Sequence, residues 1–352
     1  MITSALVPEP RAKLVEIPRY SRVAGARDIA WNVASNESPL PPGPAVVAAV
    51  ARAAAQAHLY PSVGGDALVD AVSRHCGVPP DQVLVGGGSL ALLQLALTTF
   101  TGAGTQVVHA WRSYEAYPIL IGIADADAVP VPLDGDHRHD VGAMLAAITS
   151  RTAAVIVCNP NNPTGTALPE DLLLRLIEAV PPGVLVLLDE AYREFGDSTI
   201  SAPELVRTHE NVVVFRTFSK AYGLAGLRAG FALGSRGVVD TLRSVAQPFG
   251  LSSVAEVAAV AALDDTARLD EIVGTVRSRR EIFSAQLRRR GIDVPESRSN
   301  FVYLPLRERA GQFAQACRNA GVAVRAFDGD GIRVTVGHSE AEERILGVLD
   351  AW

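Results

Sequence analysis

The chain has 352 residues, of which 48% are hydrophobic and 20% charged, and its 32 basic and 38 acidic side chains give a formal net charge of −6. A chain of this length can bury a large core and usually divides into two domains. The acidic balance argues against nucleic acid or an anionic membrane as a partner, because both are bound by basic patches. Only two of the basic residues are lysines, Lys13 and Lys220. A role that needs a side-chain amine therefore has two candidates.

The cysteines and the most apolar stretch indicate a soluble cytoplasmic protein. Cys76, Cys158 and Cys317 are too far apart for a disulfide framework or a zinc site, which suits a reducing compartment. The first residues carry no apolar run typical of a signal peptide. The segment Gln82–Trp111 lacks charged residues, but glycines and polar residues interrupt it, so we expect a buried strand, turn and helix rather than a membrane span.

In chain order, residues up to about 29 carry three prolines and are expected to form an irregular arm that includes Lys13. Beyond residue 65, short β-branched runs alternate with segments of helical period, which predicts an α/β domain with a mostly parallel sheet. The expected strands are Gln82–Val85, Gln106–His109, Ala128–Val131, Ala153–Cys158, Val184–Leu188, Val212–Phe215 and Gly230–Leu233, and the expected helices are Pro44–Ala57, Leu90–Phe100, Val141–Ile148 and Pro169–Val180.

From about residue 239 the pattern changes to long helices followed by short strands, which predicts a smaller α+β domain. A final amphipathic helix is expected from Ser339, with Ser339 as its N-cap. We therefore predict an arm (1–30), a large domain (31–240) and a small C-terminal domain (241–352). The elements expected in the small domain are helices at Val254–Leu263, Leu269–Arg290 and Ser339–Leu349, and strands at Asn300–Leu304, Val322–Arg325 and Ile332–Val336.

Four expected strands of the large domain are followed by residues that could bind a ligand or take part in a reaction. They are followed by a glycine-rich turn (86–89), an asparagine-rich loop (159–165), an Asp-Glu-Ala-Tyr segment (189–192) and Thr-Phe-Ser-Lys (217–220). Each alone has an ordinary explanation, such as a tight turn, a helix cap or a solvated lysine. Ligands of open α/β sheets bind at the carboxyl ends of the strands, so these segments should meet. An amine, a buried acid and a phosphate cradle are what a pyridine aldehyde phosphate needs.

The loop sequences also resemble a known family. Asn-Pro-Asn-Asn-Pro-Thr-Gly, Asp-Glu-Ala-Tyr and the segment from Thr217 to Gly230 are similar in order and spacing to the fold type I, class I/II aminotransferases that use pyridoxal phosphate. The resemblance points to the histidinol-phosphate aminotransferase subfamily. Residues 111–118 and 248–253 are most similar to actinobacterial aromatic amino-acid (phenylalanine) aminotransferases. The resemblance implies a large domain with a mostly parallel seven-stranded sheet, a smaller α+β C-terminal domain and pyridoxal 5'-phosphate as cofactor.

The resemblance also implies roles toward the cofactor. Lys220 would be the Schiff-base lysine and the proton carrier, and Asp189 would pair with the pyridinium nitrogen. Asn162 and Tyr192 would bind the phenolic oxygen of the ring, and Tyr114 would stack on its face. The phosphate would be held by Gly88, Ser89, Leu90, Thr217, Ser219 and Arg228, with Tyr60 reaching the phosphate of a neighbouring subunit, which makes a homodimer the expected assembly.

On the substrate side, Arg333 matches the arginine that grips the substrate carboxylate, or the phosphate of histidinol phosphate. Arg325, Tyr20 and Asn36 match the other substrate positions, and the weaker alternative for Arg325 and Tyr20 is a role in surface packing. The arm departs from the branch after Tyr20, and Leu90-Ala91 stands where many histidinol-phosphate enzymes carry an acidic pair. We therefore expect transfer between an aromatic L-amino acid and a 2-oxo acid such as 2-oxoglutarate, with histidinol phosphate as the alternative donor.

Rival functions remain open. Residues 86–91 fit G-x-G-x-x-A, but the next strand ends in Ala-Trp-Arg rather than in the acid that a nicotinamide dinucleotide would need. Ser89 nearly fits a hydrolase elbow, yet no motif places a partner histidine. His137–Asp140 could suggest a metal, although we expect a solvated loop and no metal. A decarboxylase or a carrier-linked aminotransferase would use the same cofactor and stays an alternative. A non-catalytic regulator is not expected, because no DNA-binding module or basic region precedes the cofactor domain.

Overall fold

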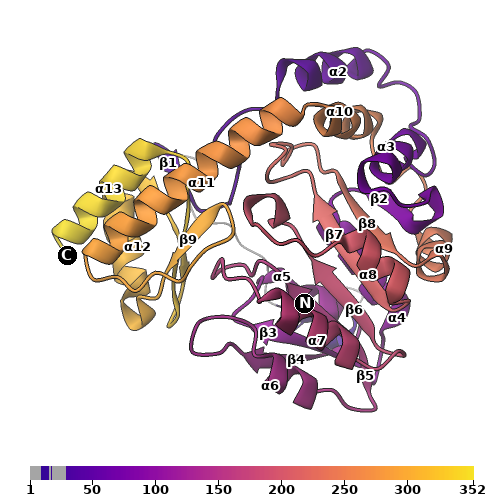
Figure 1. Ribbon diagram of the computed structural model, residues 1–352, viewed down its shortest axis with the longest axis horizontal. Coiled ribbons are helices and arrows are strands. Elements are labelled where there is room, and N and C mark those ends of the chain that lie inside the picture. Colours follow the sequence, from indigo (N-terminus) through magenta and orange to yellow (C-terminus); the bar gives the residue numbers. More distant parts are fainter. Residues whose placement is uncertain (1–8, 16, 18–28) are drawn as a thin grey trace, which may run out of the picture.

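The computed structural model describes residues 9–15, 17 and 29–352 (Figure 1). The predicted arm is not wholly irregular, because its described part contains the short helix α1 (Ala12–Val15). Lys13 Nζ lies 2.8 Å from Asp127 Oδ1 and donates to the Asp125 carbonyl at 3.2 Å, which ties α1 to the large sheet. Tyr20 falls outside the described residues. Within the described ranges, no helix is long and apolar enough to cross a bilayer.

All seven predicted strands of the large domain are present and form one sheet in the order β2-β8-β7-β6-β5-β3-β4. Strand β8 runs antiparallel to β2 and β7, and the other neighbouring pairs are parallel. The strands are β2 (Val83–Gly86), β3 (Gln106–Trp111), β4 (Asp127–Pro132), β5 (Thr152–Cys158), β6 (Leu185–Asp189), β7 (Val212–Thr217) and β8 (Gly230–Gly234).

The strands are apolar throughout because helices cover both faces of the sheet. Along β6, Val186 and Leu188 pack into one core while Leu185 and Leu187 pack into the other, as the alternation of a strand requires. The first core contains α3 (Asp66–Cys76), α6 (Val141–Ala146), α7 (Glu170–Ala179), α8 (Ala202–Thr208) and α10 (Ser253–Asp264), with α2 (Pro44–Ala54) beside α10; the second contains α4 (Ser89–Phe100), α5 (Ala116–Ile123) and α9 (Arg236–Val245).

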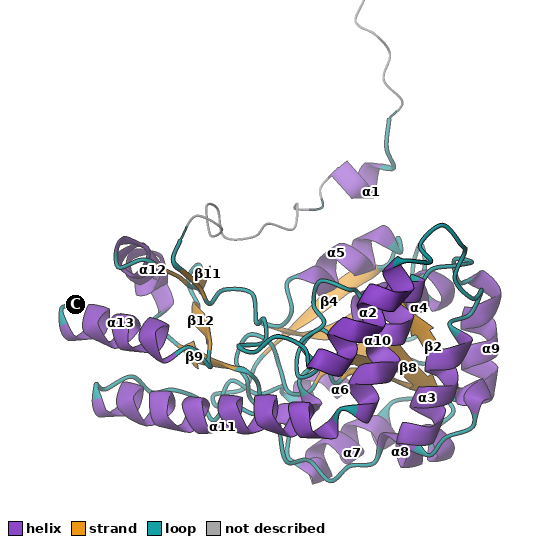
Figure 2. Ribbon diagram, turned by 90° about the horizontal axis from the view of Figure 1, so that it is seen from above, coloured by secondary structure: helices purple, strands orange, loops and turns teal. Residues whose placement is uncertain are grey.

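The C-terminal unit has its own core, formed where α11 (Thr266–Arg289), α12 (Ala310–Asn319) and α13 (Ser339–Asp350) pack on short strands. In both views α11 spans the distance between the two units (Figure 2). An antiparallel sheet has the order β11-β12-β9, and β10 pairs with β1 instead. These strands are β1 (Trp31–Asn32), β9 (Phe301–Leu304), β10 (Val322–Ala323), β11 (Arg325–Phe327) and β12 (Gly331–Thr335).

Two details of the C-terminal unit differ from expectation. The strand predicted at 322–325 is divided between two sheets, because β10 pairs with β1 from the chain's beginning. The predicted cap of the last helix is wrong, since His338 is the N-cap residue and Ser339 already lies in the helix. The division near residue 240 stays a prediction. Because α9 and α10 pack in the cores of the large sheet, we propose that the small unit begins with α11.

Candidate active site at the carboxyl ends of the strands

A cavity of about 350 Å³ lies at the carboxyl ends of the parallel strands, facing the small sheet. Its size is that of a small-ligand site. Fifteen of the predicted site residues lie in the described part of the chain, and thirteen of them line the cavity, the exceptions being Gly88 and Tyr60. The thirteen are Asn36, Ser89, Leu90, Tyr114, Asn162, Asp189, Tyr192, Thr217, Ser219, Lys220, Arg228, Arg325 and Arg333.

Lys220 follows β7 and extends its amine into this cavity. Its Nζ donates to the Asn36 carbonyl at 3.1 Å and lies 3.4 Å from the Ser35 carbonyl. Burial and the nearby guanidinium of Arg333 lower the pKa of Lys220 to about 7. A large fraction of this amine is therefore neutral near pH 7, as a nucleophile or a proton acceptor requires.

Asp189 ends β6 as a buried carboxylate. Burial raises its pKa, while hydrogen bonds from the Tyr117 hydroxyl (2.8 Å) and the Ala191 amide (3.1 Å) oppose that rise. Tyr117 is 1% exposed and lies on α5. It was not among the predicted site residues, although it stands three residues after Tyr114. Cys158 also lines the cavity, and burial raises the pKa of its thiol to about 12, so the thiol stays protonated.

The glycine-rich turn forms a cradle at the start of α4. Gly88 has φ 101°, and a Cβ there would lie 2.7 Å from Arg228 Nη2. Gly230 on β8 is packed so closely that a Cβ would lie 2.4 Å from the Ser89 amide nitrogen. Arg228 Nη1 donates to Ser219 Oγ at 3.0 Å. A helix N-terminus, an arginine and a hydroxyl thus converge, which is the donor set of a phosphate site.

Asn36 connects the small sheet to the cavity. Its Nδ2 donates to the Tyr192 hydroxyl at 2.9 Å, and its Oδ1 accepts from Thr335 Oγ1 of β12 at 3.1 Å. Arg333, also on β12, donates to Asn162 Oδ1 at 2.6 Å and to the Ala34 carbonyl. The small unit therefore closes one side of the cavity.

A second arginine of the small sheet stands beside Arg333. Arg325 on β11 pairs in register with Arg333 on β12, so both side chains extend from the same face. Both Nε and Nη2 of Arg325 donate to Glu115 Oε2, at 3.1 and 2.7 Å. Glu115 was not among the predicted site residues. The one sequence signal that could have pointed to Glu115 is its position next to Tyr114, whereas its position opposite β11 depends on the fold.

Tyr60 is not brought to the cavity within one chain. Tyr60 is 84% exposed and stacks at 4.9 Å on Phe249, on the outer surface. Tyr20 lies outside the residues that the structure describes. In the His137–Asp140 segment, His139 is buried and its Nε2 lies 3.3 Å from Asn161 Oδ1. Among the described residues, no three His, Cys, Asp or Glu side chains are placed to hold a metal ion.

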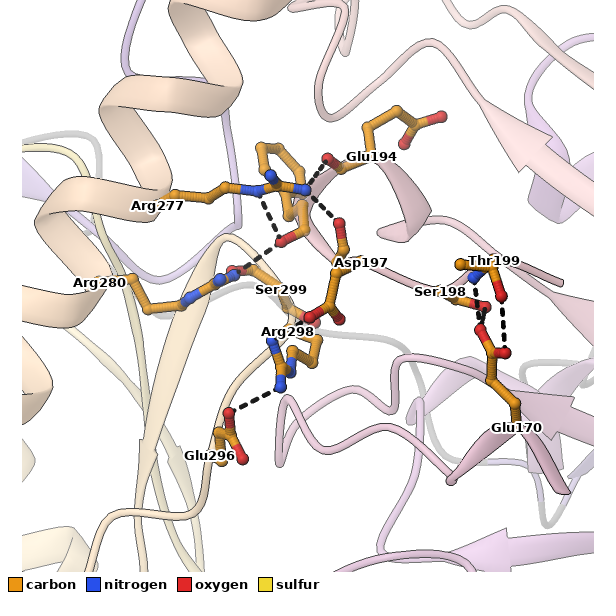
Figure 3. Close-up of polar contacts among 12 residues, drawn as sticks. Glu170, Glu194, Asp197, Ser198, Thr199, Arg277, Arg280, Glu296, Arg298 and Ser299 are labelled. Carbon is orange, nitrogen blue, oxygen red and sulfur yellow. Dashed lines mark hydrogen bonds and ion pairs between the residues drawn. The ribbon is translucent and has the colours of Figure 1, made fainter. Parts of the chain in front are cut away.

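A larger cavity, of about 710 Å³, lies at the junction of the two units, and we call it the junction cavity. Several charged groups at or next to this cavity are hydrogen-bonded within the protein, among them the lining residue Arg298 (Figure 3). Arg280 donates to the carbonyls of Phe195 (3.1 Å) and Ser299 (2.7 Å), and Arg298 bonds Asp197 at 2.8 Å. The junction cavity is lined mainly by residues 135–138, 159–160, 166–170, 196–199 and 293–298, with Glu190 and Arg193.

The smaller cavity fits pyridoxal phosphate on the chemistry of its donors. A lysine of lowered pKa, a buried carboxylate and the donors of a phosphate cradle lie around one cavity, and these are the groups that this cofactor needs. The junction cavity offers no comparable set, because Lys220 and Asp189 do not line it.

Comparison with known proteins agrees with this fit. Residues 29–346 match the family described as aminotransferase class I and II. The aromatic amino acid aminotransferases of Streptomyces avermitilis and Streptomyces coelicolor are 45% and 46% identical to the chain, each alignment covering 98% of both proteins. This chain belongs to the class I and II aminotransferases. Its cofactor is pyridoxal 5'-phosphate, and the nicotinamide and hydrolase alternatives are thereby excluded.

Solved structures place the fold in the same group. The histidinol-phosphate aminotransferase of Sinorhizobium meliloti in complex with pyridoxal-5'-phosphate has a TM-score of 0.90 and 27% identity, covering 99% of each chain. An aspartate aminotransferase of Thermus thermophilus has a TM-score of 0.81 over 97% of this chain and 98% of its own, at 22% identity, which concerns the fold alone. The fold is therefore the fold type I arrangement that the motifs predicted.

Proposed function

We propose that this aminotransferase moves an amino group between an aromatic L-amino acid and a 2-oxo acid such as 2-oxoglutarate by a ping-pong mechanism. The convergence of Lys220, Asp189 and Arg333 on one cavity carries this proposal, because a proton carrier, a partner for the pyridinium and a carboxylate receptor are what the reaction needs. The names of the relatives, which share about 45% of the sequence over nearly its whole length, support the aromatic donor.

Each role follows from the chemistry of a side chain. When bound, pyridoxal phosphate supplies an electron sink for the pair released at the substrate Cα. Asp189 holds the pyridine nitrogen in its protonated form, because a buried carboxylate attracts that proton strongly. Lys220 Nζ takes the proton from the substrate Cα and holds it for return, for which its pKa of about 7 is suited.

The remaining side chains bind and orient. The first-turn amides of Ser89 and Leu90, with Thr217, Ser219 and Arg228, hold the phosphate. Asn162 has its Oδ1 occupied by Arg333, so its Nδ2 is oriented to donate to the ring oxygen, together with the Tyr192 hydroxyl. Tyr114 covers the ring, and Arg333 receives the substrate carboxylate in a two-donor contact.

We also propose a homodimer in the cytoplasm, in which Tyr60 reaches the phosphate of the partner subunit. Tyr60 and Phe249 stack on one another while remaining 84% and 42% exposed. An apolar groove of about 890 Å³, lined by residues that include Val63, Leu95 and Leu251, lies beside them. Exposed aromatic side chains next to an apolar groove favour a protein interface.

The test is a set of single half-reactions. The loaded enzyme is mixed with phenylalanine, tyrosine or histidinol phosphate, and conversion of the cofactor is followed by absorbance. We expect phenylalanine or tyrosine to give the highest kcat/KM. Histidinol phosphate is the second candidate, favoured by the similarity to the Sinorhizobium meliloti enzyme. A clear preference for histidinol phosphate would overturn the proposed donor.

A further inference from the structure

Two arginines stand side by side where the substrate anion should bind. Arg325 and Arg333 are cross-strand partners on β11 and β12, and both line the cavity. Adjacent like charges repel unless an anion lies between or beside them. The side chains around this pair therefore determine how much negative charge a substrate can bring.

Glu115 already supplies one negative charge there. Its carboxylate accepts two hydrogen bonds from Arg325, and the paired side chains are only 28% and 15% exposed. Screening by water is weak at such a place, so the carboxylate largely cancels the charge of this guanidinium. Arg325 is also held over the buried ring of Phe327, at 5.8 Å.

Substrate anions differ in the charge that they carry. An amino-acid carboxylate carries one negative charge, which a single guanidinium can bind through two parallel hydrogen bonds. A phosphate monoester carries nearly two charges at neutral pH and three strong acceptor oxygens. It gains most from two guanidinium groups, and the Glu115 carboxylate would repel it.

From these contacts we infer that Glu115 is a specificity-determining residue. By pairing with Arg325 it adapts the anion site to a monoanionic carboxylate and disfavours the dianionic phosphate of an amino-alcohol phosphate. This inference rests on the proposed function and narrows its substrate class to donors that carry a free carboxylate.

The experiment compares the loaded wild-type enzyme with Glu115→Gln. Half-reactions with phenylalanine and histidinol phosphate give the ratio of kcat/KM values, and competition by inorganic phosphate against phenylalanine gives an inhibition constant. In E115Q the ratio should move toward histidinol phosphate by at least about tenfold, and inorganic phosphate should inhibit about tenfold more tightly.

The neighbouring ion pair provides a matched control. Arg112 Nε donates to Asp330 Oδ2 at 2.7 Å, between the same two parts of the molecule, and neither residue lines the cavity. Asp330→Asn removes the same kind of carboxylate and should shift the ratio less than about twofold. The double variant E115Q/R325Q should return the ratio to within about twofold of wild type. In this variant the Arg325 guanidinium, whose charge Glu115 cancels in the wild type, is absent as well.

The outcomes separate the two claims. A wild-type enzyme that prefers histidinol phosphate contradicts the proposed donor whatever E115Q does. An unchanged ratio and phosphate inhibition in E115Q, an equal shift in D330N, or a gain that persists in the double variant overturns the role of Glu115. Should E115Q not fold, Glu115→Ala removes the same carboxylate and is judged by the same criteria.

Discussion

The junction cavity and the candidate active site differ in how their charged groups are held. Arg298, which lines the junction cavity, bonds both Asp197 and Glu296, and Arg280, which does not line it, donates to two backbone carbonyls (Figure 3). In the smaller cavity, Lys220 lies against two carbonyls and Asp189 is held by a neutral phenol. The junction cavity therefore pairs opposite charges of the protein itself, whereas Lys220 and Asp189 of the smaller cavity are hydrogen-bonded to neutral groups. Neither Lys220 nor Asp189 lines the larger of these two cavities, so volume alone does not identify the candidate site.

The largest expected effect tests the smaller cavity. Lys220→Ala should lower turnover by roughly 10³-fold or more, because it removes the residue proposed as both the covalent anchor and the proton carrier. Borohydride should then no longer fix the cofactor to the chain. The matched control is Lys13→Ala, which removes the other lysine from a partly exposed pair with Asp127. Visible absorbance and borohydride trapping that survive in K220A would contradict the assignment.

The next effect tests the junction cavity. Arg216 bonds Glu190 at 2.8 Å, and the Glu190 side chain, which lines that cavity, is 4% exposed. Arg216→Met removes the nearer of two arginines from this buried carboxylate, leaving only Arg193 Nε at 3.9 Å, and should lower the free energy of unfolding by about 3 kcal/mol. Denaturation of the cofactor-free chain measures this.

Its control is Arg207→Met, which breaks an ion pair exposed at 68% and 56% and should leave the denaturation midpoint unchanged. If R216M unfolds at the wild-type denaturant concentration, the junction charges do not stabilise the fold and the contrast between the two cavities fails.

A smaller effect tests the support of Asp189. Tyr117→Phe removes a hydrogen bond that lowers the pKa of this carboxyl, so its pKa should rise further above the ordinary range. The function that depends on the charged carboxylate is present above its pKa and is lost as the pH falls through it. In Y117F that loss should therefore begin at a higher pH.

The measurement is the pH profile of the phenylalanine half-reaction together with cofactor affinity, which we expect to weaken by about tenfold. Tyr303→Phe, a buried tyrosine on β9 outside the cavity, is the control. An acid limb that does not move in Y117F would show that the phenol only fills space.

Much of the site could be predicted because its residues lie in local segments directly after strands. Asp189, Lys220 and the Gly88 turn follow runs whose buried character is readable in the sequence, and parallel strands bring their ends to one edge. The rest depends on pairings between distant segments. Glu115 meets Arg325 across 210 residues, and the strand expected at 322–325 is divided because β1 pairs with β10.

Some helices were missed for a local reason. Helix α5 reads Ala-Tyr-Pro-Ile-Leu-Ile-Gly-Ile, which has no polar positions to reveal a helical period. Tyr117 lies on this helix, so its contact with Asp189 could not be anticipated. The position of Tyr60 relative to a partner cannot be read from one chain, and it stays a prediction.

The close approach at Gly230 has a consequence for how this sequence can vary. The backbone of β8 touches the first turn of α4 with no room for a methyl group, and the obstructing atoms are main-chain atoms that cannot rotate away. A mutational scan would score this position as essential, although its residue has no functional group to offer. Sensitivity to substitution here reports distance between two backbones, and a search for catalytic residues by tolerance alone would count Gly230 among them by mistake.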